Sequence, residues 1–377
     1  MISQPSLPFE ELPEALVERM LGKTAELGRD LSQSFGNILG IKDDVRAEIE
    51  AKGLLQKDTD MILDPTNPTT LGVDGSYAIE KLLSIDMVAT AAVAVEGLRP
   101  PTNTVHWPRP HHLADVFTVP HNESTMLAVR GIMTCMEMNL AANAPHDVIF
   151  LDYSLFTPAI YINQALGKIS EVSERLRRRF NTYLLSGLNF FNKVVNPGNA
   201  NKIFAGVPKY TTMTELSKQL SIPAECDDRA LLTFILSPGE LVGPFQVSRA
   251  PFGWKLEGSY RKFQPTIDAI YQTLKALDII YYRPSSLYPA LRIEVTRDVA
   301  GDKNKLARVL EAVRLQCVPA GMMEPYPLYM ADRMVKHLHT ALPAIRQTTT
   351  KEMALKWEQS LGNMYMAMHG YRTEFGH

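Results

Sequence analysis

The sequence predicts an α/β or α+β protein in which a β-sheet is flanked by helices. Short apolar runs typical of buried strands come first, and further strands then alternate with segments of helical periodicity. The chain has 377 residues, of which 45% are hydrophobic. A chain of this length and composition buries a core without needing disulfides or a structural metal.

The N-terminal part is expected to be a helical arm. Within residues 9–55, four apolar side chains recur near helical spacing among charged residues: Leu16, Met20, Leu27 and Leu31. Residues 58–70 hold two prolines and several Asp, Asn and Thr, which is typical of a connector. We therefore assign residues 1–65 to an arm with its connector.

The rest of the chain is expected to form the sheet and its covering helices. Going along the middle of the chain, we predict a short strand at 71–73, a buried strand at 85–95, an irregular segment at 100–120, a helix at 122–143, a buried strand at 147–151, one long helix at 159–188 and a strand at 202–207. Towards the end, we predict strands at 279–282 and 290–295, and helices at 303–316, 328–339 and 351–366. Residues 66–345 are assigned to one domain and residues 346–377 to a C-terminal helix.

Composition excludes several classes of protein. The formal net charge of −2 argues against a globally cationic DNA binder. The three cysteines are far apart, and four histidines between 106 and 121 fit no zinc-ligand spacing, so we expect reduced thiols in a cytoplasmic protein. The longest apolar run, at 87–95, is far below the roughly 20 residues that span a bilayer. We expect neither a secretory signal nor a membrane association.

Two predicted strands end in aspartate, at Asp74 and at Asp152. A carboxylate after an apolar strand lies at the edge of the sheet, where ligands of α/β proteins gather. Gly75 permits a sharp turn and a close approach of substrate, and Ser76 adds a hydroxyl group. A single Asp in such a place is more often a turn former.

Two further carboxylates strengthen the pattern. Glu137 lies near the apolar face of the predicted helix 122–143, so it needs a partner, which is either Arg130 or a shared divalent cation. Glu294 interrupts an apolar strand and shares a face with Arg292. The alternative for Glu294 and Arg292 is a solvent-facing charge pair on a half-exposed sheet.

Carboxylate oxygens are hard ligands that suit Mn²⁺ or Mg²⁺. Two such ions about 3.5–4 Å apart activate the nucleophile and stabilise the leaving oxygen in phosphodiester hydrolysis. This chemistry needs three or four converging carboxylates and no cysteine or activated serine. The residues therefore predict a two-metal phosphodiesterase site.

In this order the motifs resemble the NurA family of DNA nucleases. They are Asp74-Gly75-Ser76, Glu137 on a helix, Leu151-Asp152-Tyr153-Ser154-Leu155, Gly206-Val207-Pro208-Lys209, Arg292-Ile293-Glu294 and Tyr326-Pro327-Leu328. Where the family has Gly in the second Asp motif, this chain has Tyr153.

The resemblance implies an RNase H-like mixed sheet with an N-terminal helical arm and C-terminal helices. It implies a nuclease acting on DNA ends with Mn²⁺ or Mg²⁺ held by Asp74, Glu137, Asp152 and Glu294. It also implies a homodimer and a hexameric HerA-type ATPase partner, in break repair or phage defence. Substrate contacts are expected from Ser76, Lys209, Tyr210 and Arg292. We expect Lys209 to neutralise a phosphate group, and Tyr210 either to stack on a base or to pack against the protein itself.

Asp332 is a departure from the family pattern. The family helix after the Tyr-Pro element carries Ala-His beside the metals, whereas this chain has Ala331-Asp332. Asp332 either replaces the histidine as a catalytic, metal-side group or forms an i, i+4 salt bridge with Lys336.

Two rival functions are compatible with parts of this pattern. One is a weakly active or inactive NurA-like scaffold that docks onto and regulates an ATPase ring, although retention of the carboxylates argues against it. The other is an actin-like ATPase, which requires glycine-rich phosphate loops that neither Asp motif supplies.

Overall fold

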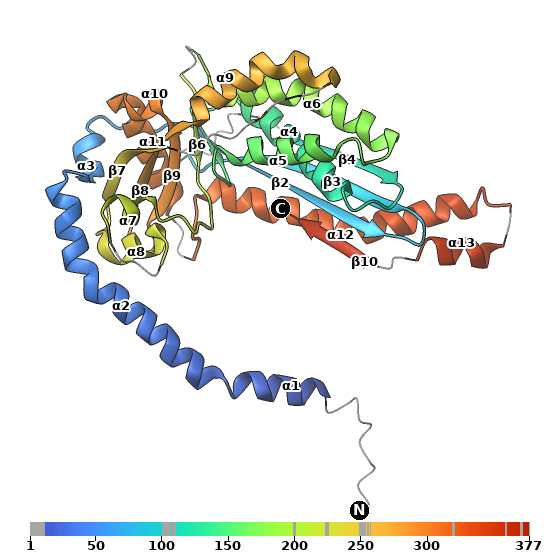
Figure 1. The fold of residues 1–377 in the computed structure, drawn as a ribbon, viewed down its shortest axis with the longest axis horizontal. Helices are drawn as coiled ribbons and strands as arrows, with labels where there is room; N and C mark the ends of the chain where they lie inside the picture. Colours follow the sequence, from blue (N-terminus) through green and yellow to red (C-terminus); the bar gives the residue numbers. More distant parts are fainter. Residues whose placement is uncertain are drawn as a thin grey trace, which may run out of the picture. The chain divides into compact units, whose positions relative to one another are not determined.

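A mixed β-sheet forms the centre of the fold (Figure 1). The computed structural model describes the chain apart from residues 1–11, 100–106, 108–110, 199–200, 223–225, 249–253, 255, 257, 319–320, 359, 370–371 and 377. The strands within the described residues are β1 (Leu55–Lys57), β2 (Thr70–Lys81), β3 (Asp86–Glu96), β4 (His111–Val119), β5 (Val148–Leu151), β6 (Ile203–Gly206), β7 (Glu240–Ser248), β8 (Ala276–Tyr282), β9 (Leu291–Thr296) and β10 (Arg372–Gly376).

The α-helices in the same described ranges are α1 (Leu12–Leu21), α2 (Thr24–Ala51), α3 (Asp58–Met61), α4 (Thr125–Asn143), α5 (Thr157–Lys168), α6 (Glu174–Val195), α7 (Glu215–Gln219), α8 (Asp228–Ile235), α9 (Gln264–Leu274), α10 (Arg297–Ala300), α11 (Lys303–Gln316), α12 (Tyr326–Ala354) and α13 (Leu361–Ala367). No helix among the described residues is both long and apolar enough to cross a membrane.

The strand order is β1-β7-β8-β9-β6-β5-β2-β3-β4, and β10 pairs with β2. The strands β2, β5 and β6 run parallel, whereas β3 is antiparallel to both β2 and β4. The prediction of a mixed α/β sheet flanked by helices is therefore confirmed.

The chain divides into two compact units, residues 1–53 with 212–235 and residues 54–211 with 236–377. The first unit contains α1, α2, α7 and α8, and the second contains the sheet. The helices predicted at 9–55 are present as α1 and α2, but the apolar side chains that predicted them are 51–68% exposed: Leu16, Met20, Leu27 and Leu31.

The two faces of β2 have different roles. Its odd-numbered residues, such as Leu71 and Val73, pack into the core that includes α4 and α6. Its even-numbered residues face α12, because Ala78 packs with Leu342 of that helix. The backbone of Gly72 lies so close to α12 that a Cβ there would be 2.4 Å from the carbonyl carbon of Pro327. Polar side chains of β2 at even positions therefore meet α12.

Several predicted element boundaries are wrong. β2 does not end at Asp74 but continues to Lys81, because β3 and β10 pair with its second half. The segment predicted to be irregular contains β4, which pairs with β3. The predicted helix 159–188 is two helices, because Ser173 caps the start of α6 by accepting a hydrogen bond from the Leu176 backbone nitrogen. The predicted helices 328–339 and 351–366 are a 29-residue α12 followed by the separate α13.

Candidate metal centre

The parallel strands β5 and β6 end at one edge of the sheet, and the parallel pairing of β5 with β2 ends at the same level. Leu151 of β5 lies opposite Val73 of β2 and Gly206 of β6. Asp152 therefore follows its strand directly beside Asp74, and the segment leading to Lys209 leaves the sheet at the same edge. The carboxyl ends of parallel strands are where α/β proteins place their ligands.

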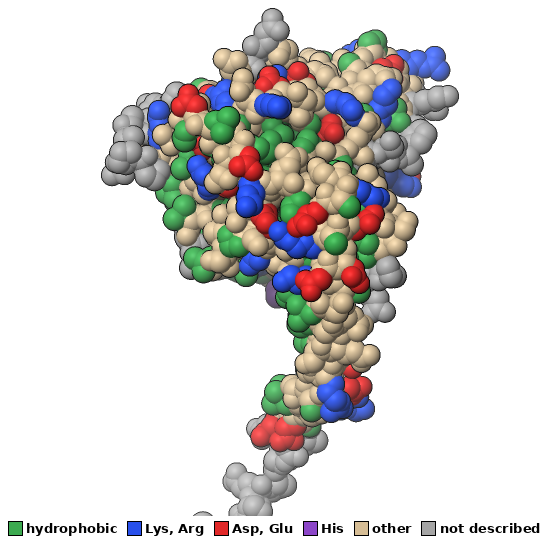
Figure 2. Space-filling view, turned by 90° about the vertical axis from the view of Figure 1, so that its left-hand side faces the viewer, with side chains coloured by type: hydrophobic (Ala, Val, Ile, Leu, Met, Phe, Trp, Pro, Cys, Tyr) green, Lys and Arg blue, Asp and Glu red, His purple; other side chains and the backbone are tan. Residues whose placement is uncertain are grey.

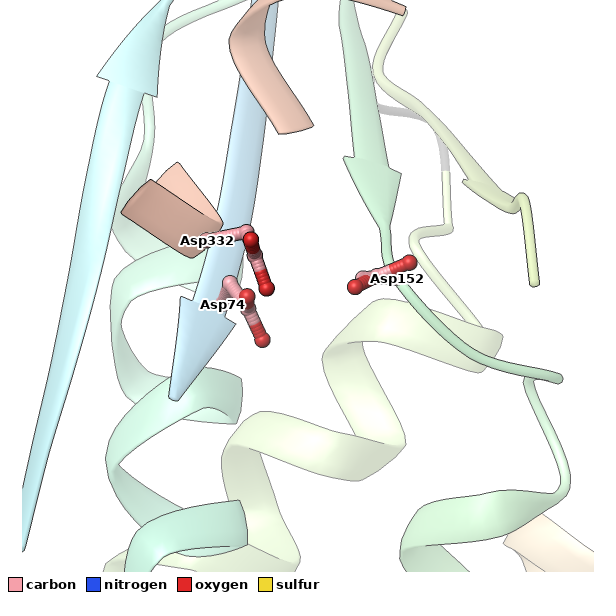
Figure 3. Close-up of side chains that lie close together, drawn as sticks. All are labelled: Asp74, Asp152 and Asp332. Atoms are coloured by element: carbon pink, nitrogen blue, oxygen red, sulfur yellow. The ribbon is translucent and has the colours of Figure 1, made fainter. Parts of the chain in front are cut away.

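Asp74, Asp152 and Asp332 converge on one point (Figure 3). Each offers a carboxylate oxygen, and these oxygens all lie within 4.8 Å of one another. Two ligands on opposite sides of Mg²⁺ are roughly 4.2 Å apart, so small side-chain movements would close the group around such an ion. The three aspartates thus come from β2, the turn after β5, and α12.

The same group contains a buried oxygen that needs a cation. Asp152 Oδ1 is buried and has no hydrogen-bond partner among the described residues. A buried carboxylate oxygen without a donor is unfavourable unless a positive charge compensates it. The donor set and this orphaned oxygen therefore fit a hard divalent cation.

Lys209 lies inside the acidic cluster. Its Nζ is 2.8 Å from Asp152 Oδ2, 3.0 Å from Asp332 Oδ1 and 3.4 Å from Glu324 Oε2. The sequence interpretation missed Glu324, which is only 8% exposed. Asp332 also accepts a hydrogen bond from Lys336 Nζ at 2.7 Å, so the predicted i, i+4 pair forms while the same carboxylate joins the cluster.

Burial dominates the electrostatics of the cluster. It raises the pKa of Asp74 to about 7, against the opposing effect of Lys209. Burial and then the neighbouring Asp74 raise the pKa of Asp152 to about 7, and burial raises that of Glu324 to about 7. Burial also acts to raise the pKa of Asp332, but hydrogen bonds from Lys336 and Lys209 hold it below its usual value. Full ionisation near neutral pH therefore calls for an added cation.

Glu137 approaches the site from α4. A Cβ at position 75 would lie 2.6 Å from Glu137 Oε1, so the carboxyl reaches the strand beside Asp74 only because residue 75 is glycine. Burial raises the pKa of Glu137 well above its usual value. Tyr153 donates a hydrogen bond from its hydroxyl to Glu137 Oε2 at 2.9 Å. Arg130, the other partner considered for Glu137, instead donates a hydrogen bond to Gln164, and its guanidinium lies 4.1 Å over the Tyr161 ring.

Glu294 and Arg292 form a buried pair, so the alternative of a solvent-facing charge pair is wrong. Arg292 donates to Glu294 Oε1 from Nη2 at 2.8 Å and from Nε at 3.1 Å. Glu294 Oε2 accepts hydrogen bonds from Ser154 Oγ at 2.6 Å and from the Leu155 backbone nitrogen at 3.1 Å. The group of converging carboxylates does not include Glu294, whose contacts instead fix the turn that carries Asp152.

The other predicted substrate residues are dispersed. Ser76 is fully buried against α12, and its Oγ lies 3.2 Å from His339 Nε2. Arg292 is 1% exposed and so lies in the interior. Tyr210 is 92% exposed and directly follows Lys209. Of the four, Lys209 contacts the acidic cluster and Tyr210 offers an open aromatic face next to it in sequence.

The fold of this chain is similar to that of known proteins, although its sequence alone gave no match. Neither protein-family models nor curated protein sequences gave a match to the chain. Among solved structures, the NurA nuclease from Sulfolobus solfataricus is 14% identical, with 93% of this chain and 99% of that chain covered at a TM-score of 0.60. A NurA bound to dAMP and manganese is 14% identical, and the match covers 82% of this chain and 93% of that chain at a TM-score of 0.50. Another NurA structure is 14% identical, and the match covers 88% of this chain and 99% of that chain at a TM-score of 0.51.

These findings define a mixed α/β protein with a buried acidic site at the edge of its sheet. More particularly, the chain has a NurA-like fold, and the resemblance predicted from the sequence motifs is confirmed at the level of the fold.

Proposed function

We propose that this chain is a divalent-metal-dependent nuclease that hydrolyses DNA phosphodiesters. The observation that carries the proposal is the convergence of Asp74, Asp152 and Asp332, together with a buried oxygen of Asp152 that has no hydrogen-bond partner among the described residues. The strand order β4-β3-β2-β5-β6, with β3 antiparallel, supports the RNase H-like architecture expected for such an enzyme. A structural neighbour described as bound to dAMP and manganese supports the choice of ligands.

In this proposal Asp74, Asp152 and Asp332 hold Mn²⁺ or Mg²⁺, with Glu137 beside them. When bound, such an ion activates water and stabilises negative charge on phosphate oxygens. Glu294 acts as a positioning residue, because its contacts to Ser154 and Leu155 hold the Asp152 turn, and Arg292 in turn holds Glu294. Tyr210 projects an exposed ring that would stack on a base.

The test is cleavage of supercoiled plasmid and linear duplex DNA with Mn²⁺, with Mg²⁺ and with excess EDTA. We expect metal-dependent cleavage by the wild-type chain and its loss by at least about 100-fold, roughly 2.7 kcal/mol, in Asp152→Asn. The matched control is Asp64→Asn, because Asp64 is exposed and lies outside the cluster. Cleavage in EDTA, or full activity of Asp152→Asn, would contradict the proposal. A folded wild-type chain without activity would favour the scaffold function.

We also propose a homodimer and a HerA-type hexameric ATPase partner, acting with this chain on DNA ends in break repair or phage defence. The exposed apolar side chains of α1 and α2 support a protein partner, since removing their apolar surface from water would be favourable. Figure 2 shows hydrophobic side chains at the surface of these helices. Light scattering that finds only monomer, or a pull-down that recovers no ATPase, would count against these partnerships.

A further inference from the structure

We propose that Lys209 is the second cation of this site, so that the protein binds one divalent ion beside a built-in ammonium group rather than two divalent ions. The inference rests on the proposed metal-dependent function and specifies its metal stoichiometry.

The first argument is the position of the Lys209 ammonium. Asp152, Asp332 and Glu324 surround it at 2.8, 3.0 and 3.4 Å. A divalent ion bound by these same three carboxylates would occupy the space of the ammonium, because its ligands would have to lie about 2.1 Å away. The Lys209 ammonium and a second ion therefore exclude each other.

The second argument is that the backbone fixes Lys209 in this place. The Val207 backbone nitrogen donates to the Leu151 carbonyl at 2.8 Å, which extends the pairing of β6 with β5 beyond its last strand residue. Lys209 follows two residues later, and its side chain is only 21% exposed. The register that brings Asp152 to the sheet edge therefore also brings the ammonium to it.

The third argument is how the oxygens of Asp152 are used. Its Oδ2 pairs with Lys209, whereas its Oδ1 is buried and unpartnered among the described residues. One oxygen thus already has a cation, and the other lacks one. In two-ion sites a carboxylate often bridges both ions, and here Asp152 would bridge one ion and the ammonium.

The fourth argument is the charge near Asp332. This carboxylate already pairs with two ammonium groups, those of Lys209 and Lys336. A second dication on the side of Asp332 that Lys209 occupies would face two positive charges at short range, and the repulsion would disfavour it. Glu324 completes the ammonium site, and its Oε2 becomes an additional metal ligand only if Lys209 is removed.

The experiment measures Mn²⁺ bound per chain by equilibrium dialysis of the full-length protein. We expect one ion for wild type, one for Lys209→Arg, and two for Lys209→Met, which keeps the length of the side chain without its charge. The double variant Lys209→Met, Glu324→Gln should return to one ion. Two ions on the wild-type chain, or one on folded Lys209→Met, would overturn the inference.

A measurement on the wild type alone covers the case in which Lys209→Met does not fold. Saturating Mn²⁺ should give the electron paramagnetic resonance spectrum of isolated ions, and the spectrum of a coupled pair about 3.5–4 Å apart would overturn the inference. The two proposals fail separately. One bound ion without DNA cleavage refutes only the nuclease function, and DNA cleavage with two bound ions refutes only the role of Lys209.

Discussion

Replacing Asp74 by asparagine should make the stability of the metal-free protein less dependent on pH. Burial raises the pKa of Asp74 from 3.8 to about 7 in the folded chain. Between about pH 4 and pH 7, Asp74 therefore keeps its proton in the folded chain but has lost it in the unfolded chain. The stabilising contribution of this proton is present below pH 4, falls as the pH rises through this window, and is gone above it.

The size of the effect follows from this difference in pKa. At about 1.4 kcal/mol per pH unit, Asp74 accounts for up to about 4 kcal/mol of stability lost between pH 4 and pH 8. Asparagine does not ionise, and its side-chain oxygen still accepts the hydrogen bond that Asp74 Oδ1 receives from the Gly75 backbone nitrogen at 2.8 Å. In EDTA at pH 8, Asp74→Asn should be more stable than wild type by up to about 4 kcal/mol.

The assay is urea unfolding followed by circular dichroism in EDTA, at several values between pH 4.5 and pH 8.5. The control is again Asp64→Asn, which should follow the wild-type curve. If Asp74→Asn is less stable than wild type at pH 8, or if the two curves run parallel, burial of an ionisable carboxyl at position 74 does not govern this stability.

Three further predictions concern residues in and around the site. Gly75→Ala should lower the rate of DNA cleavage about tenfold or more while leaving the chain folded, because the new methyl group would displace the Glu137 carboxyl. Cleavage at the wild-type rate would contradict this prediction. Gly72→Ala should lower the free energy of unfolding by about 1–3 kcal/mol, because the methyl would clash with the backbone at the start of α12; unchanged urea unfolding would contradict this. Asp332→Ala should lose cleavage at limiting Mn²⁺ while Lys336→Ala stays nearly silent, and equal rates in both would make Asp332 structural.

Local patterns in the sequence predicted most of the strands that carry the site. The apolar run that ends at Asp152 and the run that contains Glu294 are both strands, because buried strands need nearly continuous apolar residues. β4 was missed because prolines on both sides masked its alternation of partly buried and exposed residues. β7 was missed because Gly243 and Pro244 interrupt its apolar pattern, and the register with β8 shifts between Val242 and Phe245.

The site could be predicted only in part, because its members depend on different levels of structure. Asp74 and Asp152 stand out locally as acids within or after apolar strands. Asp332 could be proposed from its departure from a family motif. Glu324 lies just before Pro325 in a connector without periodicity, and its approach to Lys209 depends on how α12 docks across β2. No local pattern encodes that docking.

The same limit applies to Glu294. Its alternation with Ile293 and Val295 correctly placed it on the same face as Arg292. The pattern could not show that this face is buried, because burial there comes from the turn after β5, which lies about 140 residues earlier. Its hydrogen bonds to that turn emerge only from the folded arrangement.

Anomalous diffraction from a crystal soaked in MnCl₂ tests the metal centre most directly. We expect one anomalous peak within bonding distance of Asp74 and Asp152, with the Lys209 ammonium still paired to Asp332. A crystal that shows no peak at these carboxylates, or that holds Mn²⁺ only elsewhere on the protein, would contradict the assignment of this cluster as a metal site.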